Sequence, residues 1–535
     1  MLDDLKTQAT PPLTSQTMTL TGVKYWALPI SLALICLLTF AYTARTHTFG
    51  TYATETDFYH FYAPDAEKIA AGQFPENTYQ APGYPLIILL VSKITGDLFV
   101  AGKWVSIISA ALIVLLTFQL MARLFGYWVG IGAALIVMVS GQLPQFAIQA
   151  TTDVFFLMLC LAALSVFTSE QIAAHWRVIF TAVITGLAYL TRYNGLFLLA
   201  ACIFGIVVLD LFNRRLRQRI TLAAIFVAVF LITASPWLYF NYKHRGSPFY
   251  NTNYLNMATF FYSELAGGRI NQDGTRELSN VFHSFGEMLS YDPKRIIARY
   301  PGNLYDCLDK SINRDLVSPW VGWLAVVGAV LALIERRSKA ILLLLAAGAI
   351  FFLLMALNHW ETRYYFFITP IYAGLAVYAV CRPLELLQAR GWLNARAFAL
   401  IPAALVLMMW WTSFNFARQD VARFLATQQT EIISASDYLK SQQVSGARIL
   451  SRKPNIPYLA RQEWVFFPRM KSLNELRAWL KAHPVDYITY GSAELSARRE
   501  LAALKDPQAA PPWLKPVWTS QNPAFVLYKP ALDAE

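Results

Sequence analysis

Apolar stretches long enough to cross a membrane recur along the chain as far as residue 414, after which the sequence becomes more polar. A hydrocarbon core about 30 Å thick selects predominantly apolar helices of roughly 17 to 25 residues. Because no small-residue cleavage site directly follows the first stretch, we interpret it as a retained anchor and not a signal peptide. The pattern predicts eleven spans: Lys24 to Tyr42, Val100 to Ala122, Tyr127 to Gly141, Asp153 to Thr168, Trp176 to Leu190, Leu196 to Phe212, Ile220 to Phe240, Pro319 to Ile334, Ala340 to Leu357, Tyr364 to Val380 and Ala397 to Phe414.

Basic residues in the short connections predict the orientation of these helices. With residues 1–23 in the cytoplasm, the inner connections hold most of the clustered arginines, such as those from Arg214 to Arg219. The short outer connections hold only Arg192 and Arg363. This asymmetry follows the positive-inside rule, so we expect a cytoplasmic amino terminus.

Two long polar segments, 43–99 and 241–318, are then expected on the outer face. The first contains an apolar run from Tyr84 to Ile94, which is too short for a full crossing and would invert every later loop if it were one. We therefore expect a juxtamembrane or re-entrant helix on the outer side. Functional residues are expected on this face of the protein.

The composition changes after Phe414, where charged and polar residues become more frequent. Short helix-like and strand-like segments alternate in this tail, which predicts a soluble α/β domain over 415–535. The fold class is therefore an α-helical multi-pass membrane protein, with a membrane domain over 24–414 and a small extracytoplasmic domain. The expected helices of the tail are Thr430 to Ser441 and Leu473 to Ala482, and its expected strands are Ala447 to Leu450, Val485 to Tyr490 and Phe525 to Tyr528.

The overall composition supports a membrane protein, since 56% of the residues are apolar and only 15% are charged. The net charge of +12 could suggest nucleic acid, but most clustered basic residues lie in short loops between apolar stretches, where they act as a topology signal. We expect no nucleic-acid partner. The five cysteines provide no disulfide or thiolate metal framework, because four of them fall in or beside predicted spans.

The first outer segment carries the most specific motif. Asp57 is followed by a run of aromatic residues, and Tyr79-Gln80-Ala81-Pro82-Gly83-Tyr84-Pro85 then leads into the short apolar helix. This arrangement resembles the first outer loop of the GT-C superfamily of polyprenyl-phosphate-dependent glycosyltransferases, which includes the ArnT-like and dolichyl-phosphate-mannose protein mannosyltransferase-like families. Further similar stretches follow in order: Ala150-Thr151-Thr152-Asp153, Leu190 to Gly195, Glu361 to Tyr364, and Ser451 to Pro454.

The resemblance implies an inverting transfer of a sugar from a polyprenyl phosphate to an acceptor hydroxyl. A sugar on a lipid phosphate already has a good leaving group, so one carboxylate suffices as general base. Asp57 would be this base, and Asp153 would be a second catalytic residue. The departing phosphate requires cationic donors, and the bidentate fork of arginine suits that purpose. The candidate phosphate-binding residues are Arg192, Arg363, His359 and Lys453, and the candidate substrate-binding residues are Tyr62 and Tyr84.

Each candidate also has a purely structural explanation. An outer-loop aspartate such as Asp57 can be simply solvated, and Asp153 can cap its helix together with Thr151 and Thr152. Arg192 and Arg363 can extend to lipid headgroups without binding a substrate. His359 can be an interfacial hydrogen-bonding residue and Lys453 a solvated charge, while tyrosines such as Tyr62 are common at membrane interfaces in any case.

The resemblance leaves the substrates open. Some relatives carry an acid pair where Phe58 follows Asp57 here, and some place a lysine before the proline turn where this chain has Gln80 and Ala81. The sugar is therefore not assigned. The acceptor could be lipid A, a polysaccharide, another lipid or a protein hydroxyl. A divalent cation is equally open as a cofactor, because no cluster of histidine and carboxylate residues stands out at ligand spacing.

The predicted function is a glycosyltransferase of a bacterial-type inner membrane, with a polyprenyl-phosphate-linked sugar as donor and the lipid bilayer as its environment. A transporter or flippase of envelope glycans is the first alternative. It would place charges or broken helices near the middle of the bilayer. A non-catalytic envelope assembly protein is the second alternative, and the Asp57 motif argues against it.

Overall fold

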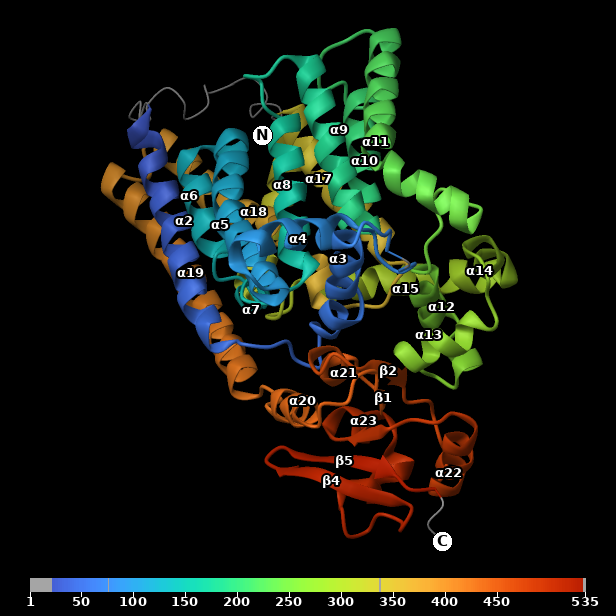
Figure 1. Ribbon diagram of the computed structural model, residues 1–535. Coiled ribbons are helices and arrows are strands. Elements are labelled where there is room, and N and C mark those ends of the chain that lie inside the picture. Colours follow the sequence, from blue (N-terminus) through green and yellow to red (C-terminus); the bar gives the residue numbers. More distant parts are fainter. Residues whose placement is uncertain (1–21, 76, 336–337, 533–535) are drawn as a thin grey trace.

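The structure is a computed structural model that describes residues 22–75, 77–335 and 338–532. A bundle of long helices forms the upper part of the molecule, and a small mixed α/β domain lies at its lower end (Figure 1). Shorter helices of the two outer segments lie between them. Residues 1–21 of the expected cytoplasmic segment, and the predicted inner-loop residues Arg336 and Arg337, lie outside the described residues.

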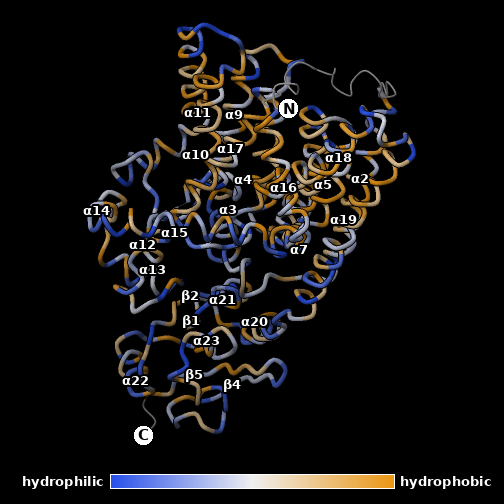
Figure 2. The backbone as a smooth tube through the Cα atoms, turned by 180° about the vertical axis from the view of Figure 1, so that it is seen from behind, coloured by the Kyte–Doolittle hydropathy of each residue, from blue (hydrophilic) through white to orange (hydrophobic). Residues whose placement is uncertain are grey.

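Every predicted span coincides with a helix. Five helices, α2, α5, α11, α18 and α19, are long and apolar enough to cross a membrane by length and composition. Figure 2 shows hydrophobic residues concentrated in the bundle and mixed polarity below it. The number of crossings stays a prediction. The helices are α2 (Val23–Thr43), α5 (Leu98–Phe125), α6 (Tyr127–Val137), α8 (Thr152–Phe167), α9 (Ala174–Thr191), α10 (Leu196–Val207), α11 (Leu216–Arg245), α16 (Pro319–Glu335), α17 (Lys339–Met355), α18 (Ile368–Ala389) and α19 (Ala395–Ala426).

Close packing of small residues holds this bundle together. A Cβ placed on Gly328 of α16 would lie 2.0 Å from the carbonyl oxygen of Leu375 in α18, so the two helices touch through their backbones. Without a hydrophobic driving force between helices in lipid, such contacts and van der Waals packing provide the association. The largest buried cluster includes residues of α5, α6, α8, α16 and α18.

The first outer segment folds into a π-helical turn (Phe58–Tyr62) followed by α3 (Ala63–Ala70) and α4 (Gly83–Thr95). The short apolar helix expected from Tyr84 is therefore present as α4, which packs against α5 and α9. A Cβ on Gly83 would lie 2.6 Å from the carbonyl oxygen of Leu190. The glycine of the proline turn thus lets this segment approach the end of α9, beside Arg192. The side of the membrane on which α4 lies stays a prediction.

The second outer segment forms a compact group of helices with its own buried cluster. They are α12 (Tyr254–Phe261), α13 (Gln272–Ser279), α14 (Phe285–Tyr291) and α15 (Pro293–Ser311). Side-chain caps begin three of them, since Asn271, Ser284 and Asp292 accept backbone N–H groups of α13, α14 and α15. The group lies beside the bundle and above the tail domain (Figure 1).

The tail contains a five-stranded sheet in the order β2-β1-β3-β5-β4. The inner strands β1 (Arg448–Ser451), β3 (Tyr487–Tyr490) and β5 (Ala524–Pro530) correspond to the three predicted strands. The edge strands β2 (Glu463–Phe466) and β4 (Leu514–Gln521) were not predicted. The pairs β1–β2 and β1–β3 are parallel, and β5 is antiparallel to both neighbours.

Four helices accompany the sheet: α20 (Glu431–Ser441), α21 (Asn455–Leu459), α22 (Leu473–Ala482) and α23 (Ser492–Ala497). Two of them, α20 and α22, match the predicted helices closely. The preceding helix α19 continues to Ala426, so it extends past the predicted end of the last span at Phe414.

Polar side chains fasten the tail to both outer segments. The amide nitrogen of Asn455 donates to the carbonyl oxygens of Gly50 and Thr51, at 3.0 and 3.1 Å. The buried guanidinium of Arg498 donates to both carboxylate oxygens of Asp273, at 3.0 and 2.8 Å. Because these bonds join the tail to segments 43–99 and 241–318, the tail covers the end of the bundle where those segments meet.

Candidate active site

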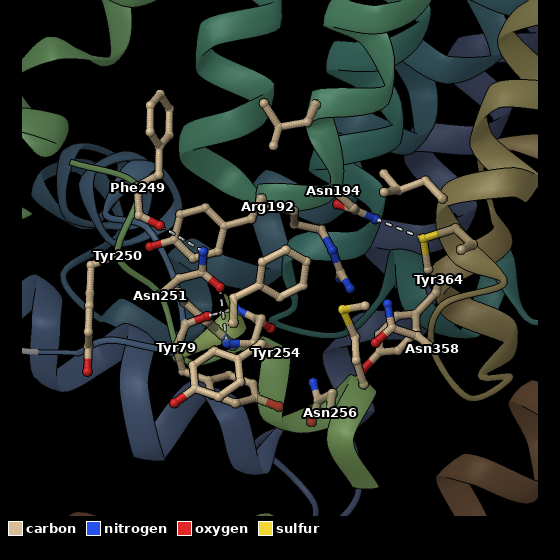
Figure 3. Close-up of a pocket in the computed structure, with 18 of the residues that line it drawn as sticks. Tyr79, Arg192, Asn194, Phe249, Tyr250, Asn251, Tyr254, Asn256, Asn358 and Tyr364 are labelled. Carbon is tan, nitrogen blue, oxygen red and sulfur yellow. Dashed lines mark hydrogen bonds between the residues drawn. The ribbon is translucent and has the colours of Figure 1, made fainter. Parts of the chain in front are cut away.

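A cavity of about 620 Å³ lies where the first outer segment, the start of α10, the second outer segment and the end of α17 meet. Figure 3 shows the side chains around it, which come from elements far apart in the sequence. Asp57, Tyr62, Arg192 and Arg363 all line this cavity. The structure therefore brings half of the eight predicted site residues to one surface.

Asp57 stands at the entrance to the π-helical turn, and its carboxylate faces the cavity. Its side chain keeps 31% of its surface exposed although it lies deep among protein groups, since the exposed part opens into the cavity. Burial raises the pKa of Asp57 above its ordinary value, and the nearby Arg363 guanidinium partly opposes this rise. A carboxylate with a raised pKa binds a proton more readily than a solvated one.

Arg363 lies at the centre of the charged groups. Its Nη1 is 3.6 Å from Asp57 Oδ2 and 3.9 Å from Asp153 Oδ2. The same guanidinium forms a two-point hydrogen bond with Glu361, at 3.0 and 3.3 Å. Three carboxylates therefore converge on one arginine, which fixes its planar fork beside the cavity.

Arg192 provides the second cation of the cavity wall. Its Nη1 donates to Asp153 Oδ1 and, at 3.1 Å, to the hydroxyl oxygen of Thr152. Asp153 is almost completely buried, and its Oδ2 has no hydrogen-bond partner among the described residues. Asp153 therefore lies behind the cavity surface and holds the two arginines in place. No contact of Asp153 with the cavity itself is present in the described part of the chain.

Two aromatic candidates differ in position. The ring of Tyr62 lines the cavity, and its hydroxyl lies 3.4 Å from that of Thr152. Tyr84 is fully buried behind it, with the two rings edge to face at 4.8 Å. Direct substrate contact by Tyr84 therefore gains no support from its position, and its described contacts are those of a packing residue.

His359 and Lys453 lie near the cavity without being part of its lining. The ring of His359 packs edge to face on Tyr364 at 6.1 Å, and burial lowers the pKa of His359. Lys453 comes from the bend after β1 in the tail. Burial lowers the pKa of Lys453 to about 8, and the charge of Asp57 acts on it in the opposite direction. The tail thus contributes a charge to the surroundings of Asp57.

Sequence reasoning missed the neutral part of the cavity wall. It is built mainly from amide and tyrosine side chains, and the signal for it was the run Tyr250-Asn251-Thr252-Asn253-Tyr254-Leu255-Asn256 in the second outer segment. This wall also includes Tyr79, Asn194, Asn358 and Tyr364 (Figure 3).

The arrangement of carboxylates bears on the question of a metal. No group of three or more histidine, cysteine or carboxylate side chains is placed to hold an ion within residues 22–75, 77–335 and 338–532. Asp57, Asp153 and Glu361 do converge, but the guanidinium of Arg363 stands between them. The three carboxylates present therefore form an arginine-centred cluster.

Comparisons with known proteins agree with this architecture. The model of the dolichyl-phosphate-mannose-protein mannosyltransferase family matches residues 79–240. No curated protein matches the sequence of the chain. The chain is similar to the apo crystal structure of the Archaeoglobus fulgidus oligosaccharyltransferase, with a TM-score of 0.62 and 12% identity, over 90% of this chain and 72% of that one.

Two further structures contain a lipid phosphate. The archaeal oligosaccharyltransferase AglB from Archaeoglobus fulgidus, in complex with an inhibitory peptide and a dolichol-phosphate, matches 96% of this chain and 75% of its own, with a TM-score of 0.60 and 13% identity. ArnT from Cupriavidus metallidurans, bound to undecaprenyl phosphate, matches 95% of this chain and 98% of its own, with a TM-score of 0.54 and 13% identity.

Identities this low establish a shared fold and leave activity to be argued from the site. The fold class expected from the sequence is confirmed. The family model covers the Pro-Gly-Tyr-Pro turn and the helices that follow it, and the chain has the fold of the Archaeoglobus fulgidus oligosaccharyltransferase and of ArnT from Cupriavidus metallidurans.

Proposed function

We propose that the chain is an inverting glycosyltransferase that moves a sugar from a polyprenyl phosphate to an acceptor hydroxyl, with Asp57 as general base. The observation that carries the proposal is the cavity in which the Asp57 carboxylate lies beside two arginines. A base and a phosphate-binding pair on one wall are the two elements that this reaction requires. The family model and the fold support the same class of reaction.

The raised pKa of Asp57 suits a base. Proton transfer is most effective when the pKa of the catalytic group lies near the working pH. Burial moves the pKa of Asp57 in that direction, while the Arg363 guanidinium at 3.6 Å favours the ionised carboxylate that can accept a proton. In the proposed step the acceptor oxygen forms a bond to the anomeric carbon, and its proton passes to Asp57. The bond between the anomeric carbon and the phosphate oxygen breaks, and its electron pair stays on the phosphate.

Arg192 and Arg363 are the proposed phosphate contacts. Both line the cavity, and each is held by a carboxylate behind it. The described hydrogen bonds of Arg192 use only Nη1, so its other donors remain available for a phosphate oxygen. Undecaprenyl phosphate in the ArnT structure and dolichol-phosphate in the AglB structure support a lipid phosphate as ligand of this fold.

The location of the site bears on the transporter alternative. A transporter is expected to carry ionisable residues near the middle of the bilayer. Here Asp57, Arg192 and Arg363 all belong to connections at the end of the bundle that the tail covers. This position supports an enzyme that acts at the membrane surface. We propose the inner membrane, with a cytoplasmic amino terminus and the cavity on the outer face.

The test is sugar transfer in membranes from cells that lack the native protein. Undecaprenyl phosphate esters of labelled hexoses serve as donors, and release of undecaprenyl phosphate is followed. Asp57→Asn keeps the size of the side chain and removes the base, so transfer should fall by about 10² to 10⁴ at equal membrane insertion. Asp309→Asn, an exposed aspartate of the second outer segment, is the matched control and should transfer normally. Normal transfer by Asp57→Asn would overturn the assignment of the base.

A further inference from the structure

The cavity has two chemically different parts. Asp57, Arg192 and Arg363 form the charged part. Neutral amide and tyrosine side chains make up much of the remaining lining, and Figure 3 shows Asn256 and Tyr79 together below Arg192. Asn194, Asn251, Asn253, Asn256 and Asn358 contribute the amides. We call these five residues and Tyr79 the amide wall.

Part of the amide wall has a fixed shape of its own. The amide nitrogen of Asn253 donates to the carbonyl oxygen of Tyr79, and the Oδ1 of Asn251 accepts the backbone N–H of Asn253 at 3.1 Å. Asn256 hydrogen-bonds the hydroxyl of Tyr79. The ring of Tyr79 is also stacked on Phe61 at 5.9 Å, nearly parallel. The aromatic face of Tyr79 is thus held rigidly at the edge of the cavity.

Other polar atoms of the cavity have no partner. The Oδ1 of Asn194 and the Oε1 of Gln80 are buried, and neither forms a hydrogen bond with a described residue. The amide nitrogen of Asn194 reaches only the sulfur of Met355, at 3.8 Å, which is a weak acceptor. Buried polar atoms without partners are costly, so an occupant that donates and accepts hydrogen bonds would be stabilising here.

The cavity is lined by few charged groups. Among the lining residues that the structure describes, Asp57 is the only carboxylate, and Arg192 and Arg363 are the only permanent cations. Both arginines already face carboxylates. An ammonium group on a bound sugar would find no carboxylate other than the base, and a sugar carboxylate would have to compete with the donor phosphate for the same two arginines. Neither charge on the sugar would gain a counter-charge of its own.

We propose that the amide wall binds an uncharged, hydroxyl-rich sugar ring and rejects sugars that carry an amine or a carboxylate. Amides match sugar hydroxyls because both donate and accept hydrogen bonds. The face of Tyr79 provides an apolar surface for the C–H groups of the ring. The inference rests on the proposed function, since it assumes that the sugar is carried on a lipid phosphate bound by Arg192 and Arg363.

Binding can be tested without knowledge of the acceptor. The full chain is reconstituted in liposomes with labelled undecaprenyl phosphate, and displacement is measured with undecaprenyl phosphate esters of glucose, glucosamine and glucuronic acid. The galactose series is run in parallel, because the preferred stereochemistry is unknown. In at least one series the neutral ester should bind about tenfold or more tightly than both charged esters. Differences below threefold in both series would overturn the proposal.

A charge placed in the amide wall gives an independent test. Asn358→Asp should shift the preference toward the amino sugar by about tenfold relative to the neutral sugar, because a carboxylate then faces the amine. Asn256→Asp provides a second position, since either variant alone could disturb the fold. Asn280→Asp, on an exposed loop of the same outer segment, is the control and should leave the preference unchanged. An unchanged preference in both wall variants would contradict the proposal.

The binding experiment distinguishes failure of the proposed function from failure of the assignment of the amide wall. If undecaprenyl phosphate itself does not bind to the wild type, the proposed function is wrong. If it binds and the three esters of each series compete equally, the proposed function stands and the assignment of the amide wall is wrong.

Discussion

The ion pair that joins the tail to the second outer segment gives the most quantitative prediction. Arg498 is completely buried, and all five of its N–H groups donate hydrogen bonds. Two of the five go to Asp273, and the other three go to the carbonyl oxygens of Phe467, Pro468 and Ala497. Among the residues that the structure describes, Asp273 is therefore the one negative charge within hydrogen-bond distance of this buried cation.

Asp273→Ala removes two of the five acceptors and leaves the guanidinium buried without a counter-charge. Breaking a buried ion pair in this way typically costs about 3–5 kcal/mol. Every 1.4 kcal/mol is a factor of ten in an equilibrium, so the population with an open interface should rise about a hundred- to several-thousand-fold. In an Arg498→Met background the same change should have a smaller effect, because the buried Arg498 cation is gone and Asp273 then faces only the longer contact with Arg452, at 3.9 Å.

Limited proteolysis can measure this opening. The Arg452–Lys453 bond lies in the bend after β1, and the Arg452 guanidinium is itself only 3.9 Å from Asp273 at the interface. Trypsin cleavage of this bond, followed by mass spectrometry, tracks the open population when opening and closing are fast relative to cleavage. Asp437→Ala removes an exposed carboxylate of the tail and should leave the rate unchanged. A rate for Asp273→Ala within threefold of the wild type would refute the reasoning.

Four further outcomes are expected. The folded-state pKa of Asp57 is raised, so its charged form opposes folding above that pKa. The Asp57→Asn variant should therefore unfold at the same temperature as the wild type or a higher one at neutral pH. A lower unfolding temperature in thermal melts would contradict this. Burial raises the pKa of Glu431 to about 7, so the tail should lose stability as pH rises through 7. In denaturation experiments at a series of pH values, the stability of Glu431→Gln should not change over this range. Lys453, with a pKa lowered to about 8, should lose its charge above that pH. The KM for the donor should then rise in a pH series. The Lys453→Arg variant keeps its charge and should show no such rise. Transfer should persist in a chelator, because Arg363 stands between the three converging carboxylates; loss of activity that added Mg²⁺ or Mn²⁺ restores would show that this is wrong.

The hydropathy pattern was sufficient for the helices of the bundle, because lipid imposes length and composition on each one separately. It failed at their ends. The predicted helix from Tyr127 to Gly141 ends at Val137, and α19 runs twelve residues beyond Phe414, as its bounds show. The exact end of a helix depends on tertiary contacts, which apolar patterning does not register.

Burial explains which strands of the tail were visible in the sequence. The residues of β3 are all buried and those of β1 nearly so, which makes them short apolar runs. Glu463 in β2 is exposed, and the remaining residues of this edge strand are only partly buried. The other edge strand, β4, contains Pro516 and alternates irregularly between exposed and partly buried positions. Edge strands carry weaker sequence signals because only one side of each is paired.

The charged residues of the candidate site were predictable from the sequence, but their arrangement was not. Asp57, Arg192 and Arg363 were predictable, since charged residues are rare in short connections between membrane helices. Their mutual distances were not, because these connections are joined only when the helices pack. Nor could the sequence show that Tyr250 to Asn256 would lie at the same cavity as Asp57. That placement depends on contacts such as the hydrogen bond between Thr78 and Thr252.

The position of Arg363 beside Asp57 on the cavity wall suggests how the proposed reaction would conserve charge. A sugar phosphodiester carries one negative charge, and the released phosphate monoester carries up to two. In the same step Asp57 accepts the acceptor's proton and loses its own charge. Arg363, at 3.6 Å from Asp57, would be partly freed from that carboxylate at the moment when the phosphate becomes more negative. Its attraction to the phosphate would therefore be stronger in the transition state than in the bound donor, which is the kind of interaction that accelerates a reaction.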